Sequence, residues 1–106
     1  MAIKTAWIVM VPDADPVRHK AVIKTSKYET TMVLVTDCDQ AVDICKGLVQ
    51  REGVQVISLC PDFTNKDVAR IAESVGEGTP INVCRADAPS LFAQYQLVKK
   101  EGWFEK

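Results

Sequence analysis

Four short apolar runs, separated by polar turns and helical patterns, set the frame of the chain. They cover residues 3–11, 30–36, 54–60 and 81–85. The run from Val54 to Cys60 is rich in β-branched side chains and has little alternation, as in strands that are buried on both faces of a parallel sheet. We therefore predict four strands, with the third run as the one around which the rest of the chain is placed.

The two middle connections have the clearest helix signals. Asp37 is a good N-cap for a helix that ends at Gly53, and its apolar residues recur at spacings of three and four. After the third strand, Thr64 and Asp67 have the spacing of a capping box, which predicts a helix that closes at Gly76. The amide groups of that helix start should point towards the carboxyl end of the sheet.

The first and last connections are also predicted as helices. Asp15 as N-cap and Pro16 at the first helical position predict a short helix over 16–23. Asp87 and a following proline predict a last helix that leads to Gly102, with four side chains facing inwards: Leu91, Phe92, Tyr95 and Val98. The aromatic tail at Trp103 and Phe104 either covers the core of its own subunit or anchors a subunit interface.

These elements alternate as βαβαβαβα, which predicts one α/β domain over residues 1–106. Each connection is long enough for a right-handed crossover, so the sheet should be parallel and four-stranded. With the strand order 2-1-3-4, the fold class is a flavodoxin-like three-layer sandwich.

Composition narrows the function classes. The chain has 13 basic and 14 acidic residues, so no net positive charge favours nucleic acid or an anionic membrane. It has no leader-like start and no apolar stretch of about 18 residues, and we expect a cytoplasmic protein. A thin sheet of this size has exposed edges, so we also expect a homo-oligomer.

The four cysteines are dispersed and should be reduced, and with a single histidine they give no metal-ligand spacing. The glycines follow helices rather than strands, which argues against a nucleotide-binding loop. We therefore predict neither a metal nor a cofactor.

The candidate site lies at the carboxyl ends of the strands, where loops and helix N-termini of open α/β sheets bind ligands. A thiol near a helix N-terminus can have a lowered pKa and act as a nucleophile, which makes Cys60 the leading catalytic candidate. The predicted residues are, for catalysis, Cys60, Asp62 and His19, and, for ligand binding, Asp13, Asp15, Phe63, Thr64, Cys84, Arg85 and Asp87.

Several segments together resemble a small bacterial α/β family known only as a domain of unknown function. They are the opening 4–9, the turn 13–19, the loop 60–63 and the helical segment 68–72. The resemblance extends over almost the whole chain and implies the α/β fold described above. It implies no activity.

The leading functional prediction is a small oligomer that binds a small molecule, anions included, at the carboxyl ends of its strands. One alternative is a lyase- or isomerase-type enzyme that uses Cys60 with Asp62, Asp13 or His19. A second alternative is an interaction or structural subunit without a ligand, in which Trp103 and Phe104 matter most.

Overall fold

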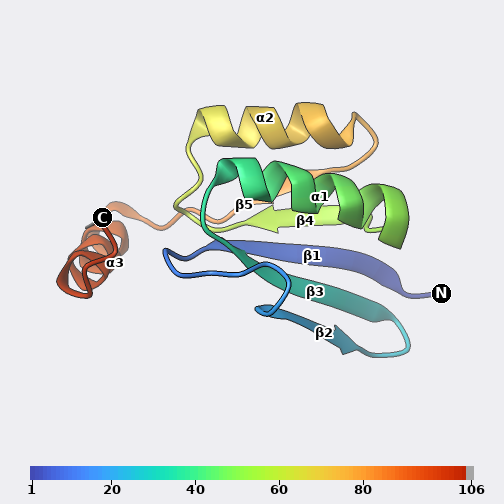
Figure 1. Ribbon diagram of the computed structural model, residues 1–106, viewed down its shortest axis with the longest axis horizontal. Helices are drawn as coiled ribbons and strands as arrows, with labels where there is room; N and C mark the ends of the chain where they lie inside the picture. The colour runs from blue at the N-terminus through green and yellow to red at the C-terminus, as the bar shows by residue number, and fades with distance from the viewer. Residues whose placement is uncertain (105–106) are drawn as a thin grey trace.

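The computed structural model describes residues 1–104, which form five strands and three helices (Figure 1). In chain order the elements are β1 (Ile3–Met10), β2 (Lys20–Lys24), β3 (Tyr28–Val35), α1 (Cys38–Glu52), β4 (Val56–Leu59), α2 (Asn65–Val75), β5 (Ile81–Val83) and α3 (Ala88–Lys100).

The strands form one mixed sheet in the order β2-β3-β1-β4-β5. β1 lies between β3 and β4 and is parallel to both, and β5 is parallel to β4. β2 is antiparallel to β3. The expected α/β class with a largely parallel sheet is confirmed, but the prediction of four strands, all parallel, in a flavodoxin-like order is wrong because β2 adds a fifth, antiparallel strand.

That additional strand replaces the predicted helix over 16–23. The side chain of Asp15 does accept the N–H groups of Val17 (3.0 Å) and Arg18 (3.5 Å), but it stabilises a turn and not a helix start. After this turn Val22 and Ile23 pair with β3, since β-branched residues fit a pleated surface. A three-residue turn at 25–27 closes the hairpin.

The two middle helices form as predicted. Asp37 accepts the N–H of Gln40 at the start of α1, and Gly53 ends the helix with a φ of 73°, a left-handed conformation that favours glycine. At the start of α2, Thr64 and Asp67 make both hydrogen bonds of the capping box. These capping residues determine where α1 begins and ends and where α2 begins.

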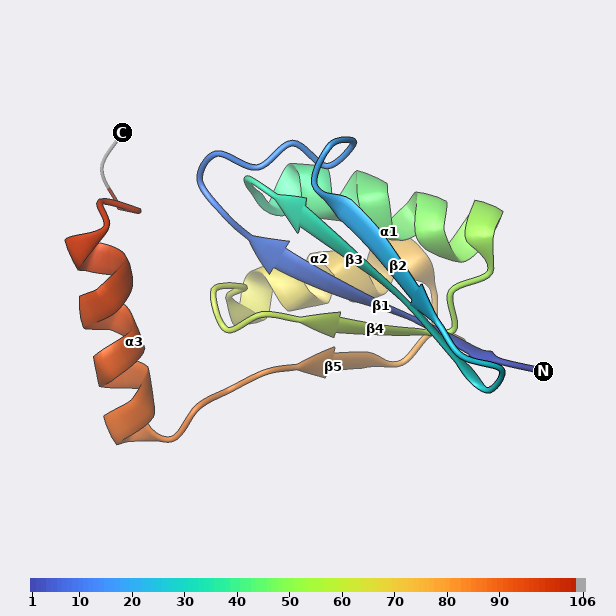
Figure 2. The same cartoon turned by 90° about the horizontal axis from the view of Figure 1, so that it is seen from below.

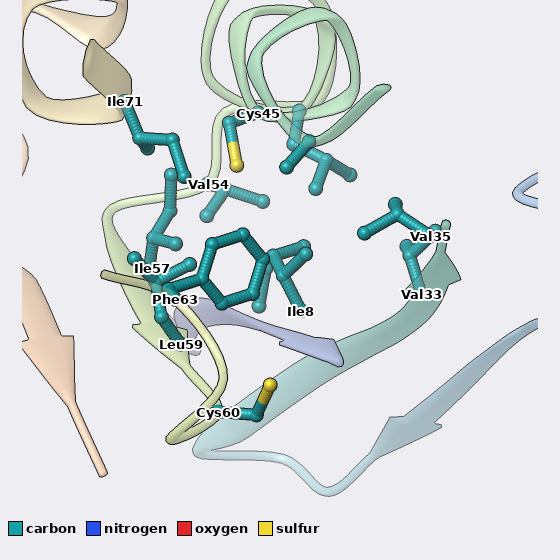
Figure 3. Close-up of a cluster of buried hydrophobic side chains, with 13 residues drawn as sticks. Ile8, Val33, Val35, Cys45, Val54, Ile57, Leu59, Cys60, Phe63 and Ile71 are labelled. Carbon is teal, nitrogen blue, oxygen red and sulfur yellow. The ribbon is translucent and has the colours of Figure 1, made fainter. Parts of the chain in front are cut away.

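The core lies between the sheet and the pair α1 and α2, which cover the same face (Figures 1 and 2). Figure 3 shows Ile8, Ile57, Phe63 and Ile71 converging below the helices, and all four are fully buried. An ion pair between Arg70 and Asp39 (2.7 Å) joins the outer surfaces of the two helices.

α3 lies apart from this core. The extended segment 84–87 carries it beyond the carboxyl ends of the strands (Figure 2). The radius of gyration is 14.2 Å, whereas a compact domain of this length has about 13 Å. None of the four side chains predicted to face inwards is buried: Leu91, Phe92 and Tyr95 are each about half exposed or more, and Val98 is partly buried.

Within residues 1–104 the other face of the sheet therefore has no helix over it, and the predicted three-layer sandwich is reduced to two layers. We call this surface the open face. Strand pairing and the alternation of side chains assign to it the odd-numbered residues of β1 and β2 and the even-numbered residues of β3, β4 and β5. Among them are Ile3, Trp7, Ile23, Tyr28, Met32 and Leu34.

Candidate functional site

The strand ends and α3 enclose a pocket at the carboxyl edge of the sheet. Its volume is about 240 Å³. We call it the α3 pocket. Val9, Met10, Cys60, Pro61 and Asp62 line it from the strand ends and the loop after β4, and Leu91, Gln94, Tyr95, Val98, Trp103 and Phe104 line it from α3 and the tail. Most of these side chains are apolar, and Asp62 carries the charge.

Cys60 and Asp62 are the two predicted catalytic residues that the structure places in this pocket. For Cys60 the structure gives the surroundings of the thiol. Its own N–H donates to the carbonyl of Ile8 (3.1 Å), and its Sγ accepts the N–H of Met10 (3.4 Å). Burial raises the pKa of the Cys60 thiol, although the hydrogen bond from Met10 opposes this shift. At neutral pH the group is a thiol and not a thiolate, which disfavours the role of nucleophile.

A second hollow adjoins the α3 pocket and shares Pro61, Asp62 and Leu91 with it. Pro61, Asp62, Thr64, Asn65 and Arg85 contribute to it. Arg85 Nη1 donates to the carbonyl of Pro61 (2.7 Å), and its Nη2 donates to Asn65 (3.4 Å). The guanidinium therefore holds the loop, and the predicted neighbours Asp62, Thr64 and Arg85 do come together here.

Three further predicted binding residues have structural roles. Phe63 is fully buried in the core (Figure 3). Asp87 is the N-cap of α3, and the N–H of Ser90 on its carboxylate lowers the pKa of Asp87. Cys84 is exposed, and its N–H continues the pairing of β5 with the carbonyl of Leu59 (2.8 Å).

The residues predicted from the first connection lie elsewhere. Asp13 is in an exposed turn, and the N–H of Asp15 donates to Nδ1 of His19 (2.9 Å). Within residues 1–104, neither pocket contains these three residues and no hydrogen bond joins His19 to Cys60. A dyad of Cys60 and His19 is therefore not formed in this structure.

The other cysteines belong to the helix-covered side. Cys45 is fully buried, and burial raises the pKa of Cys45 to about 12. Burial also raises the pKa of Cys38, which lies two turns earlier on α1. All four cysteines are free thiols, and the part of the chain that the structure describes holds no cluster of three or more metal-ligating side chains.

The sequence interpretation missed the contribution of α3 to the pocket. Leu91, Tyr95 and Val98 lie on one side of this helix at spacings of three and four, and this signal did predict an apolar stripe. Trp103 and Phe104 were expected to cover the core or to anchor a subunit interface; within the chain, Phe104 stacks on Tyr95 with ring centres 5.3 Å apart. The sequence pattern did not indicate which surface of the domain this stripe faces.

The fold and the pocket define a small mixed α/β domain with one helix-covered face and an apolar pocket at the carboxyl edge of its sheet. The chain belongs to a family of unknown function, DUF6506, whose model matches residues 3–98. This confirms the resemblance seen in the sequence, and it brings no activity with it. Searches of curated proteins and of solved structures found no match.

Membrane insertion by a helix has no support in the described residues. None of the three helices within residues 1–104 is both long and apolar enough to cross a bilayer.

Proposed function

We propose that this domain binds a small molecule with an apolar body in the α3 pocket. The observation that carries the proposal is the composition of the pocket wall, where three aromatic side chains and Val98 from one end of the chain face Val9 and Cys60 at the strand ends. Concave apolar sites with a few polar groups are typical of ligand pockets. The location agrees with the crevice expected at the carboxyl ends of parallel strands.

The size of the pocket limits the ligand. A volume of about 240 Å³ holds on the order of eight to ten non-hydrogen atoms, since a water molecule takes about 30 Å³ of liquid. This is the size of a single substituted aromatic ring or a short branched chain.

Charge in the pocket favours a neutral or cationic ligand over an anion. Asp62 is exposed at the rim, and Gln94 offers both a donor and an acceptor. The guanidinium of Arg85 lies in the other hollow and is engaged with Pro61 and Asn65. The raised pKa of Cys60 adds a neutral thiol to the wall and supports binding over nucleophilic catalysis.

Three probes with the same ring and different charge test the proposal: benzylamine, benzyl alcohol and benzoate. We expect backbone amide shifts in NMR titrations at Val9, Cys60 and Val98, with an affinity near 1 mM for benzylamine and about tenfold weaker for benzoate. Asp62→Asn should remove this preference and leave the binding of benzyl alcohol unchanged. Asp13→Asn is the matched control, since Asp13 lies outside the pocket.

Two results would contradict the proposal. The first is an absence of shifts at the pocket residues with all three probes. The second is tighter binding of benzoate than of benzylamine, with shifts at Thr64 and Asn65, which would move the site to the hollow beside Arg85.

A further inference from the structure

The open face of the sheet carries no charged side chain. Alternation assigns only apolar or uncharged polar residues to it on all five strands, which lie entirely within the described part of the chain. The charged strand residues Lys4, Lys20, Lys24 and Glu29 all point to the side of the helices. Lys20 there pairs with Glu52 of α1 (3.4 Å).

This distribution departs from the usual one, because both faces of the sheet are largely apolar. A sheet with one face in solvent normally has polar side chains on that face and apolar ones on the other. Here Met32 is 46% exposed and Ile23 is 68% exposed on the open face. Contiguous apolar patches of this kind mark surfaces that are covered by a partner.

From this we infer that two copies of the chain pair through their open faces, and that α3 of each copy forms part of the same interface. The inference goes beyond the proposed binding of a small molecule and does not depend on it. Two sheets that pack face to face would leave the α1 and α2 layers on the outside of the dimer.

The area of the two open faces alone is small for a stable dimer, which is why we include α3 in the interface. Five strands about 4.8 Å apart and about five residues long offer on the order of 400 to 600 Å² per copy. The sheets alone would then bury about 800 to 1,200 Å², which is at the low end for a stable complex of about 1,600 Å².

The exposed apolar side chains of α3 that lie outside the α3 pocket supply the difference. Phe92 is 66% exposed and Leu97 is 61% exposed. At about 100 Å² for each side chain they add on the order of 200 Å² per copy, which brings the total to about 1,200 to 1,600 Å², within the range of stable complexes.

The position of α3 suits this role. The helix projects beyond its own sheet on the segment 84–87 (Figure 2), and no residue of α3 is buried in the isolated chain. Contact with a second copy therefore costs it little existing packing. Phe92 and Leu97 lie outside the α3 pocket, so they can face the partner while the pocket keeps its lining.

Sedimentation equilibrium of the full chain over a range of concentrations tests the inference, with two matched variants. Met32→Glu places a carboxylate on the open face, and each dimer would bury it twice, so we expect the dimer dissociation constant to rise by at least about 100-fold. Val22→Glu is the control, because Val22 is 49% exposed on the same hairpin but points to the opposite side. It should change the constant by less than about threefold.

A variant on α3 keeps the test valid if Met32→Glu fails to fold. Phe92→Ser changes a residue that is 66% exposed and outside the core, and it should weaken the dimer about tenfold. Circular dichroism in dilute solution checks that each variant is folded.

Three outcomes would overturn the inference. One is a native chain that stays monomeric at about 100 μM, well above the dissociation constants of stable dimers. If small-angle scattering then shows a radius of gyration near 13 Å, α3 has folded over its own sheet. The others are a dimer that tolerates both Met32→Glu and Phe92→Ser, and a monomer whose open face is covered by a different partner.

Discussion

The two faces of this sheet carry similar apolar side chains but differ in what lies over them. On one face Ile8 and Val33 are buried beneath α1 and α2, and on the other Trp7 and Met32 belong to the same two strands without a helix above them. The apolar side chains of the helix-covered face are removed from water within one chain. The open face shows that an apolar strand pattern alone does not determine whether a helix of the same chain covers it.

The largest expected difference is between the helix-covered core and α3, and it concerns the free energy of unfolding. Phe63→Ala should destabilise the protein by about 3 to 5 kcal/mol, because it removes a fully buried ring from the centre of the core. Phe92→Ala should cost less than about 0.5 kcal/mol in dilute solution, since this ring on α3 is exposed. Urea denaturation measures both. Equal losses would mean that α3 is part of the core.

Removal of the N-caps of α2 and α3 should give a smaller difference in stability between the core and α3. Thr64→Ala removes half of the capping box of α2 and should cost about 1 kcal/mol of global stability, while Thr64→Ser should retain most of it. Asp87→Ala removes the N-cap of α3 and should leave the urea midpoint in place, but increase amide exchange at Ser90 and Leu91. A common shift of the midpoint by both alanine variants would contradict the separation of α3 from the core.

Acid should produce the smallest and most local effect. The pKa of Asp87 is lowered because its carboxylate accepts the N–H of Ser90. Its contribution to α3 is therefore present above the ordinary carboxyl pKa and is lost as the pH falls through the lowered value. The protection factor of the Ser90 amide, which is the exchange rate corrected for its intrinsic pH dependence, should fall in that window when it is followed by NMR from neutral to acid pH. Asp87→Asn should show no such step, and a step that persists would assign the effect to another group.

Local signals in the sequence predicted the elements that local interactions specify. The helix over 37–53 and the capping box at Thr64 depend on residues three or four apart, and both were correct. The prediction of a helix over 16–23 was wrong because Asp15 caps an isolated turn with the same side-chain hydrogen bonds that start a helix. What decided the outcome was pairing with β3, a contact that no helix signal reports.

The sequence predicted only one of the two walls of the candidate site. Cys60 and Asp62 follow a buried strand, so their place at the carboxyl edge could be expected from the direction of the chain. The opposite wall comes from Tyr95 and Trp103, whose apolar character was visible but whose destination depends on the path of residues 84–87. That path is a tertiary feature without a local sequence signal.

The edges of the sheet limit how far association can proceed. The hairpin strand β2 has Lys20 and Lys24 at its ends, and β5 at the other edge is three residues long. Short or lysine-bearing edges resist the addition of further strands. With the open face as its inferred association surface and two edges of this kind, the molecule would form a closed pair and not an open-ended fibre.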